Sequence, residues 1–169
     1  GRVLKVGDGV SKVKIGDKVV GFTLFNGYSS RISLPENQLI KLPNHFTLEQ
    51  GACLPAAHMT AYYALYQIFH LPPESLLLVH SAAGGVGSAL VSLATARGHR
   101  VVGVVGNPLK KEYVIQLGAT EVFARGDNGF SYGEIADKFG NNFDAVFDAN
   151  GYVTLRFSYD ILKPTGKLV

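Results

Sequence analysis

Cysteine is nearly absent from this sequence of 169 residues, because Cys53 is the only one. A single thiol cannot form a disulfide within the chain, and it cannot supply a site that needs several thiolates, such as a four-cysteine zinc. Cys53 lies between Ala52 and Leu54, so we expect it to be a small buried side chain. The low cysteine content therefore excludes a disulfide framework and a structural zinc cluster.

Long apolar runs and clusters of positive charge are lacking as well. No apolar stretch reaches about 18 residues, the length needed to cross a membrane, and no basic segment precedes an apolar run as in a signal peptide. The net charge is +3, but the Lys and Arg residues are scattered, whereas nucleic-acid binding usually needs a clustered patch. We therefore expect a cytoplasmic protein that binds neither membranes nor nucleic acid.

Both ends of the sequence have the pattern of strands. Residues 1–6 begin an apolar alternation without a preceding Met, and residues 166–169 end in the middle of an apolar run. Natural domains seldom begin or stop inside a strand. We therefore expect the sequence to be a fragment of a longer protein.

Two different patterns divide the chain. Short β-branched runs separated by turns predict a small all-β unit over the first 46 residues, with strands at residues 3–6, 12–15, 18–22 and 30–34. Helices are expected from Thr47, because Thr47 and Gln50 have the spacing of a capping box. Pro55 is expected to interrupt that helix, and a second helical run is expected over residues 58–69. The aromatic residues of this run have helical spacing, which predicts packing of Tyr62, Tyr63, Tyr66 and Phe69.

Strands alternate with helices in the second pattern. The expected strands cover residues 76–80, 101–105, 121–124 and 145–147, with a fifth from Lys167. The expected helices begin near Val86, Asn107, Tyr132 and Thr154, and the last of them is expected to run to Leu162. The run at 76–80 is apolar throughout, as a strand buried on both faces of a parallel sheet requires. This order predicts an α/β fold with a doubly wound parallel Rossmann sheet.

A glycine-rich turn follows the first of these strands. Residues 81–87 read Ser-Ala-Ala-Gly-Gly-Val-Gly, so Ala82, Gly84 and Gly87 occupy the three positions of the G-x-G-x-x-G fingerprint. The missing side chain at Gly84 lets the backbone approach a pyrophosphate, and Gly87 lets the helix pack closely on the strand. The helix N-terminus then offers free N–H groups to phosphates. Because a strand, a helix and the next strand surround it, the turn predicts dinucleotide binding.

The residues after the second strand indicate which dinucleotide is bound. An NAD site usually has Asp or Glu here to hold the ribose 2′-hydroxyl, and this chain has Asn107 instead. Lys110 and Lys111 follow, and Arg125 ends the third strand. A missing carboxylate together with added cations suits a 2′-phosphate, although any single lysine of this kind could be a solvated surface charge. We therefore expect NADP(H) as the cofactor.

Several groups of residues occur in an order that is typical of one protein family. They cover residues 6–10 with 14–19, 54–55, 60–65, 79–87, and 143–151 with 162–166. By these residues the chain resembles the quinone oxidoreductase, or zeta-crystallin-like, branch of the medium-chain dehydrogenase/reductase superfamily. The resemblance implies that residues 1–54 are part of a GroES-like catalytic domain whose N-terminal part is missing. Residues 55–169 would form an NADP-binding Rossmann domain whose last strand is cut short.

The resemblance also implies a role for individual residues of the cofactor site. The residues that would cradle the pyrophosphate are Ala83, Gly84, Gly85, Val86 and Gly87. Thr60 would lie near the nicotinamide end, and Asn150 would approach the nicotinamide ribose. Asn107 and Lys110 would hold the 2′-phosphate. Arg125 stands where the family often has a Tyr beside the adenosine, which is a departure from the pattern.

The same resemblance bears on zinc. Zinc alcohol dehydrogenases of this superfamily place a cysteine ligand four residues before the threonine that matches Thr60, and this chain has Ala56 there. The cysteine-rich lobe of those enzymes is missing too, since Phe22 runs almost directly into Tyr28. His58 could be a metal ligand or a proton donor, but helix packing is the commoner role of such a residue. A zinc-free protein without a metal site is therefore expected.

A zinc-free member of this branch would deliver hydride from NADPH to a quinone or an α,β-unsaturated carbonyl compound. No catalytic residue can be assigned from the sequence, and a homodimer is expected. An enoyl-reductase module of a polyketide or fatty-acid synthase is an alternative, because its glycine loop and Thr-Ala motif look much the same. A non-catalytic NADPH-binding member is a second alternative. A methyltransferase is a third, which Lys110 and the upstream β unit argue against.

Overall fold

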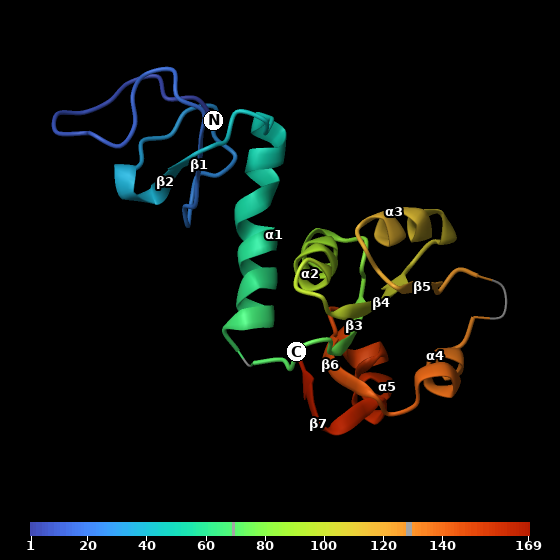
Figure 1. Ribbon diagram of the computed structural model, residues 1–169. Coiled ribbons are helices and arrows are strands. Elements are labelled where there is room, and N and C mark those ends of the chain that lie inside the picture. Colours follow the sequence, from blue (N-terminus) through green and yellow to red (C-terminus); the bar gives the residue numbers. More distant parts are fainter. Residues whose placement is uncertain (69, 128–129) are drawn as a thin grey trace. The chain divides into compact units, whose positions relative to one another are not determined.

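The computed structural model describes residues 1–68, 70–127 and 130–169. They form two compact units, Gly1–Met59 and Thr60–Val169, and the division falls inside helix α1 (Leu48–Tyr66) (Figure 1). The domain boundary expected between residues 54 and 55 lies in the same helix. Phe69, a member of the predicted aromatic set, lies outside the described residues. None of the helices described is both long enough and apolar enough to cross a membrane.

A small antiparallel sheet is the regular part of the first unit. It consists of β1 (Val19–Gly21) and β2 (Leu39–Lys41), and the 3-10 helix η1 (Glu36–Gln38) directly precedes β2. An isolated antiparallel bridge joins Arg2 to Lys18. Of the runs predicted as strands, the one around β1 is therefore confirmed.

The other runs predicted as strands, residues 3–6, 12–15 and 30–34, are turns and irregular segments. β-branched residues form a strand only where a neighbouring strand offers its backbone groups as partners. Here the backbone finds other partners, for example where the Lys12 amide donates to the Glu36 carboxylate at 2.8 Å. Sequence pattern alone therefore overstates the strand content of this unit.

Helix α1 begins at the predicted capping box. The Thr47 amide donates to Gln50 Oε1 at 2.9 Å, and the Gln50 amide donates to Thr47 Oγ1 at 3.1 Å. The predicted break at Pro55 is wrong, because the helix continues through this residue to Tyr66. Proline removes one N–H and its ring crowds the preceding turn, but Ala, Leu and Met residues on both sides favour helix and outweigh that cost.

Cys53 is exposed on α1, which corrects the expectation that it is buried. The packed face of this helical turn is the one that carries Gly51, where an added Cβ would lie 2.9 Å from Leu42 Cδ1. Residues two positions apart on a helix do not share a face. Cys53 therefore points away from the Leu42 side chain, whatever its intrinsic preference for burial.

The aromatic residues of α1 differ in their packing. Tyr66 Oη donates to the Leu93 carbonyl at 2.9 Å, and the Arg97 guanidinium lies 5.0 Å from the centre of the Tyr66 ring. The Tyr62 ring packs edge-on against the Tyr66 ring, with the ring centres 5.0 Å apart, although Tyr62 keeps an exposed face. Tyr63 is exposed. The predicted packing is therefore confirmed for Tyr66 and Tyr62, and Tyr63 does not share it.

The second unit is built on a five-stranded sheet in which every pair of neighbours is parallel. Its strands are β3 (Leu76–His80), β4 (Arg100–Val105), β5 (Glu121–Ala124), β6 (Phe143–Phe147) and β7 (Leu162–Leu168). The spatial order is β5-β4-β3-β6-β7, so the chain first builds outward from β3 in one direction and then in the other. This is the order of a doubly wound Rossmann sheet, and the predicted fold class is confirmed.

Helices cover both faces of this sheet (Figure 1). They are α2 (Gly85–Thr95), α3 (Lys111–Gln116), α4 (Tyr132–Phe139) and α5 (Leu155–Asp160), with the 3-10 turns η2 (Pro108–Lys110) and η3 (Gly151–Val153). Successive residues of a strand point to opposite faces. Accordingly Leu77 packs in one core with residues of α2, and Leu78 packs in a second core with Ile135 of α4. A strand buried on both sides needs the unbroken apolar run that β3 has.

The end of the chain differs from the prediction. The helix expected to run to Leu162 ends at Asp160, and β7 begins at Leu162 rather than at Lys167. Pairing with β6 explains the early start, because Leu162 lies opposite Phe143 while Lys167 lies opposite Ala145, with a register shift between. Pro164 and Gly166 disfavour a strand by their local propensity. Pairing with β6 outweighs that preference and extends β7 through both residues.

Candidate functional site at the carboxyl ends of the strands

The glycine turn brings α2 very close to β3. Ser81 follows β3 with φ of 52°, and the Gly84 amide donates back to the Ser81 carbonyl at 2.8 Å. A Cβ added at Gly87 would collide with the Ser81 carbonyl and would lie 2.9 Å from Ala82 Cα. Only glycine permits this approach of helix to strand, so the packing role predicted for Gly87 is confirmed.

The N-terminus of α2 is open to an anion. Gly84 is its N-cap and has no side chain that could accept from the first-turn amides. The first amides of a helix have no acceptor within the helix, so those of Gly85, Val86 and Gly87 remain available. A Cβ at Gly84 would lie 3.1 Å from the Ser81 carbonyl, so a side chain would crowd this cradle. Helix dipole and free amides together favour a phosphate here.

The loop after β4 places a cluster of polar groups next to this turn in the sheet. Asn107 Oδ1 accepts from the Leu109 amide at 2.9 Å, and Pro108 occupies the first turn, as the sequence predicts for a helix start. Lys110 is exposed and has no ion-pair partner in the described part of the chain. Lys111, by contrast, pairs with the Asp127 carboxylate at 3.1 Å.

Arg125 lies at the end of β5, beside the same loop. Its amide donates to the Val105 carbonyl at 2.9 Å. A Cβ added at Gly106 would be 3.6 Å from the Arg125 guanidinium, so the cation reaches back over the end of β4. The structure therefore brings Arg125 to the strand end that precedes Asn107, and Lys110 follows one 3-10 turn later.

A hydrogen-bond network around a partly buried carboxylate lies on the other side of the glycine turn, after β6. Asp148 Oδ1 accepts from the amides of Asn150 and Gly151 at 2.9 and 3.0 Å. Thr154 Oγ1 lies 2.6 and 2.7 Å from the two carboxylate oxygens, and Ser158 Oγ donates to Oδ2 at 2.8 Å. Burial raises the pKa of Asp148, but the hydrogen bonds outweigh it and hold that pKa below its usual value. The carboxylate is therefore ionised at neutral pH.

His80, the last residue of β3, continues this network. Its side chain is 1% exposed, and its Nε2 lies 3.1 Å from Ser158 Oγ. Because Ser158 gives its proton to Asp148, it must accept from His80, which places the His80 proton on Nε2. Burial lowers the pKa of His80 from 6.5 to about 4, against the opposing influence of Asp148. His80 is therefore neutral, and its Nδ1 has no partner among the described residues.

Asn150 links the network to the glycine turn. Its Oδ1 accepts from Ser81 Oγ at 3.0 Å, which ties the loop after β6 to the turn after β3. Its Nδ2 is buried and finds no acceptor among the described residues. A buried donor without a partner is costly, so a bound group that accepts from Nδ2 would stabilise this arrangement.

Asp148, Thr154, Ser158 and His80 are missing from the set of site residues predicted from the sequence. The Asp148-Ala149-Asn150-Gly151 segment after a buried strand is a signal for an Asp-capped turn, because Asp accepts from backbone amides two and three residues on. That signal could have found the carboxylate. It could not have found His80, which the sequence shows only as the end of an apolar run.

Thr60 lies on α1 with an exposed side chain, as do Ala56 and His58. Exposure of His58 corrects the expectation that it packs within its helix. Among the described residues, no group of three or more His, Cys, Asp or Glu side chains could hold a metal ion. The role predicted for Thr60 stays a prediction.

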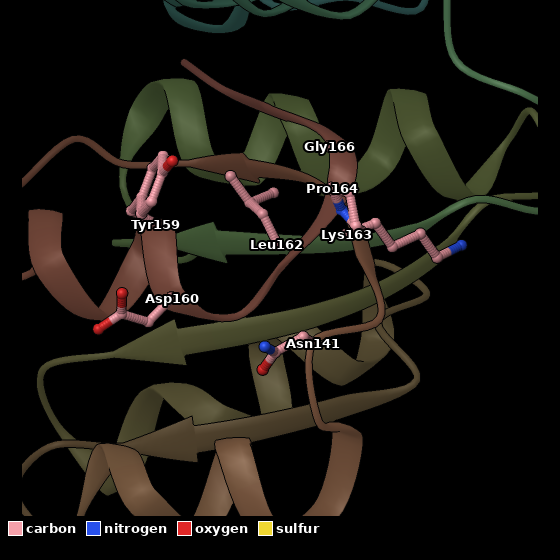
Figure 2. A pocket seen from close by; sticks show the side chains of 7 residues that line it. All are labelled: Asn141, Tyr159, Asp160, Leu162, Lys163, Pro164 and Gly166. Carbon is pink, nitrogen blue, oxygen red and sulfur yellow. The ribbon is translucent and has the colours of Figure 1, made fainter.

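A separate cavity of about 300 Å³ lies at the opposite ends of the strands (Figure 2). Its lining residues are Asn141, Tyr159, Asp160, Leu162, Lys163, Pro164 and Gly166. Lys163 Nζ is 2.6 Å from Asp144 Oδ1, and Asp144 Oδ2 accepts from the Leu76 amide, so both groups tie together the starts of β3, β6 and β7. The cavity therefore lies at the end of the sheet opposite the glycine turn, and its lysine is already neutralised.

Comparisons with known proteins agree with this geometry. A family model described as zinc-binding dehydrogenase matches residues 85–169. A reducing polyketide synthase of Cochliobolus heterostrophus is 31% identical over 172 residues, which cover 100% of this chain and 7% of that protein. The chain thus spans a small part of the curated relatives that it matches.

Two solved structures are similar over 99% of the chain. The quinone oxidoreductase of Escherichia coli complexed with NADPH is 31% identical, with a TM-score of 0.86, and the chain covers 52% of it. The CurK enoyl reductase is 30% identical, with a TM-score of 0.88, and the chain covers 50% of it. The chain therefore spans about half of each of these proteins.

Proposed function

The chain belongs to the zinc-binding dehydrogenase family, in the quinone oxidoreductase branch of the medium-chain dehydrogenase/reductase superfamily, and from this we propose that it forms the NADPH-binding part of an oxidoreductase. The observation that carries the proposal is the open N-terminus of α2 at Gly84, beside a sheet whose strand order reverses at β3. Ligands of such sheets bind at the carboxyl ends of the strands at this reversal.

The chain's own residues fit this cofactor. The amides of Gly85, Val86 and Gly87 would hold the pyrophosphate, with Ala83 and Gly84 forming the wall of the cradle. On the side of β6, Asn150 Nδ2 would donate to the nicotinamide ribose and so gain the acceptor that it lacks. Thr60 would lie toward the nicotinamide.

The 2′-phosphate would lie over the ends of β4 and β5. Lys110 and Arg125 supply positive charge there. Asn107 Oδ1 caps η2, while its Nδ2 has no partner among the described residues and would donate to the phosphate. Lys111 contributes less, because Asp127 already neutralises it. This distribution of charge supports a preference for NADPH over NADH.

NADPH supplies a hydride when it is bound, and quinones and α,β-unsaturated carbonyl compounds are the acceptors that we propose. One similar protein is a quinone oxidoreductase and another an enoyl reductase. Because curated relatives that match the whole chain are reducing polyketide synthases, an enoyl-reductase module is the second candidate function. We propose a reaction without zinc, since Ala56 stands where the zinc alcohol dehydrogenases of this superfamily have a cysteine ligand.

The cofactor preference is tested by removing one charge at each of two lysines. Lys110→Gln should weaken NADPH binding about tenfold, the value of one exposed charge-assisted contact, and should leave NADH binding nearly unchanged. Lys138→Gln is the matched control, because Lys138 pairs with Glu121 at the amino end of β5, whereas the proposed phosphate site lies at the carboxyl end of that strand. Equal losses of NADPH and NADH binding in Lys110→Gln would contradict the proposed role.

The reaction is tested by turnover of the full-length protein with a quinone panel and with an enoyl-thioester panel. Faster NADPH oxidation with thioesters assigns the enoyl-reductase function, and faster oxidation with quinones assigns the quinone reductase function. A chelator should change neither rate. Tight NADPH binding without turnover on either panel would show a non-catalytic member and would contradict the enzyme assignment.

A further inference from the structure

The carboxylate of Asp148 has more partners than a turn requires. A capped turn needs the amides of Asn150 and Gly151, which Oδ1 accepts. Two hydroxyl groups add to these, because Thr154 and Ser158 both donate to the same carboxylate. Each hydroxyl is on a side chain with no exposed surface. The whole segment from β6 to α5 is therefore built around a single acceptor.

No cation compensates this charge in the described part of the chain. The ion pairs of the second unit involve other carboxylates, and His80, which reaches the network through Ser158, is neutral. Asp148 is partly exposed, and its hydrogen bonds hold its pKa below the usual value, so they stabilise the ionised carboxylate in the folded chain. Asparagine would not be equivalent, because its amide nitrogen cannot accept from a hydroxyl donor. The four donors therefore require a carboxylate at this position.

The network leads to the Asn150 side chain, which lies against the glycine turn. The Asp148 carboxylate fixes the Asn150 amide, and the Asn150 side chain in turn accepts from Ser81 at 3.0 Å. Ser81 adopts φ of 52°, which is unusual for a residue with a side chain, at the start of the glycine turn. Asn150 thus joins the carboxyl ends of β3 and β6, the neighbouring strands at which the strand order of the sheet reverses.

We propose that Asp148 is a positioning residue, which holds Asn150 in place for the nicotinamide half of the cofactor while leaving the adenosine half unaffected. This inference rests on the proposed NADPH site. It predicts that Asp148 acts through Asn150, so that substitution of Asp148 weakens only the contacts with the nicotinamide half of the dinucleotide. The other end is held by groups after β4 and β5, which share no hydrogen bond with Asp148 among the described residues.

The test compares NADPH with a ligand that lacks its nicotinamide half. The full chain is titrated with NADPH and with 2′-phospho-ADP, which keeps the adenosine half and both phosphates but has neither the second ribose nor the nicotinamide. Asp148→Asn should weaken NADPH binding about tenfold, equivalent to about 1.4 kcal/mol, and should change binding of 2′-phospho-ADP less than about twofold. Asp160→Asn is the matched control, because Asp160 ends α5 and pairs with the exposed Arg156. It should change neither affinity.

A double-mutant cycle separates positioning from general stability. Asn150→Ala should show the same selective loss as Asp148→Asn, and the double variant should bind NADPH no more weakly than Asn150→Ala alone. Additive losses would overturn the proposal, and so would equal weakening of both ligands by Asp148→Asn. If Asp148→Asn does not fold, Ser158→Ala replaces it, because this substitution removes only one of the hydrogen bonds to Asp148. It should weaken NADPH binding selectively as well, but by a smaller factor.

The binding data also distinguish an error in the proposed NADPH site from an error in the positioning role of Asp148. A wild-type chain that binds neither NADPH nor 2′-phospho-ADP contradicts the proposed cofactor site and this inference with it. A wild-type chain that binds both, with a variant Asp148→Asn that also binds both unchanged, contradicts only the positioning role.

Discussion

Protonation of His80 should make the second unit sensitive to mild acid. The side chain is 1% exposed and its pKa is lowered from 6.5 to about 4. In the unfolded chain this histidine takes up a proton as the pH falls below about 6.5, whereas in the folded chain it stays neutral until about pH 4. The unfolded state therefore binds more protons in this window, and folding stability falls as the pH is lowered through it.

The size of the effect follows from the two pKa values. At about 1.4 kcal/mol per pKa unit, His80 should cost about 2 kcal/mol of unfolding free energy at pH 5 relative to pH 7, and about 3 kcal/mol at pH 4. Below the folded pKa the loss should level off. Burial is the main cause of the lowered pKa, and the nearby Asp148 carboxylate opposes it.

The measurement is urea unfolding of wild type and His80→Gln, followed by circular dichroism at pH 7 and pH 5. The amide of the introduced glutamine can still donate to Ser158 but does not titrate, so all other groups contribute alike to both proteins. The gap between the two unfolding free energies should narrow by about 2 kcal/mol at the lower pH. If the unfolding free energies of both proteins fell by the same amount between pH 7 and pH 5, His80 would not be the group that titrates.

Three further substitutions have consequences for stability. Gly87→Ala drives a Cβ into the Ser81 backbone and should destabilise the chain by about 1–3 kcal/mol, whereas Gly7→Ala, where nothing lies within 4 Å, should be nearly neutral in the same thermal melt. Tyr66→Phe removes the hydrogen bond to the Leu93 carbonyl and should cost about 1 kcal/mol in urea unfolding; an unchanged midpoint would show that this bond contributes nothing. Ser131→Ala breaks the capping box of α4 and should cost about 1 kcal/mol in urea unfolding; an unchanged free energy of unfolding would contradict this.

The second unit could be predicted closely from the sequence because its signals are local and strong. Strand β3 is apolar over its whole length, and the glycine turn, the capped turn at Asn107 and the next strand follow in a fixed order. Each of these features depends on burial of both faces of the sheet or on backbone geometry. None of them requires knowledge of a distant partner.

Several of the wrong predictions concern places where contact with a residue distant in the sequence determines the structure. Pairing with β6 starts β7 at Leu162, and the packing of Gly51 on Leu42 turns Cys53 toward solvent. The same holds for the site, since the link between His80 and Asp148 passes through Ser158 on another element. Residue types in sequence order do not reveal such contacts, whereas the glycine turn is continuous in sequence and could be recognised.

The proposals above all depend on binding of the NADPH pyrophosphate at the open N-terminus of α2. An amide NMR titration of the full chain with NADPH measures this binding residue by residue, because each backbone N–H reports on its own position. We expect the amides of Gly85, Val86 and Gly87 to shift most, followed by Lys110 and Asn150, with saturation at a lower concentration than for NADH. Shifts confined to the separate cavity around Asn141 and Lys163, or no saturable shifts at all, would contradict it.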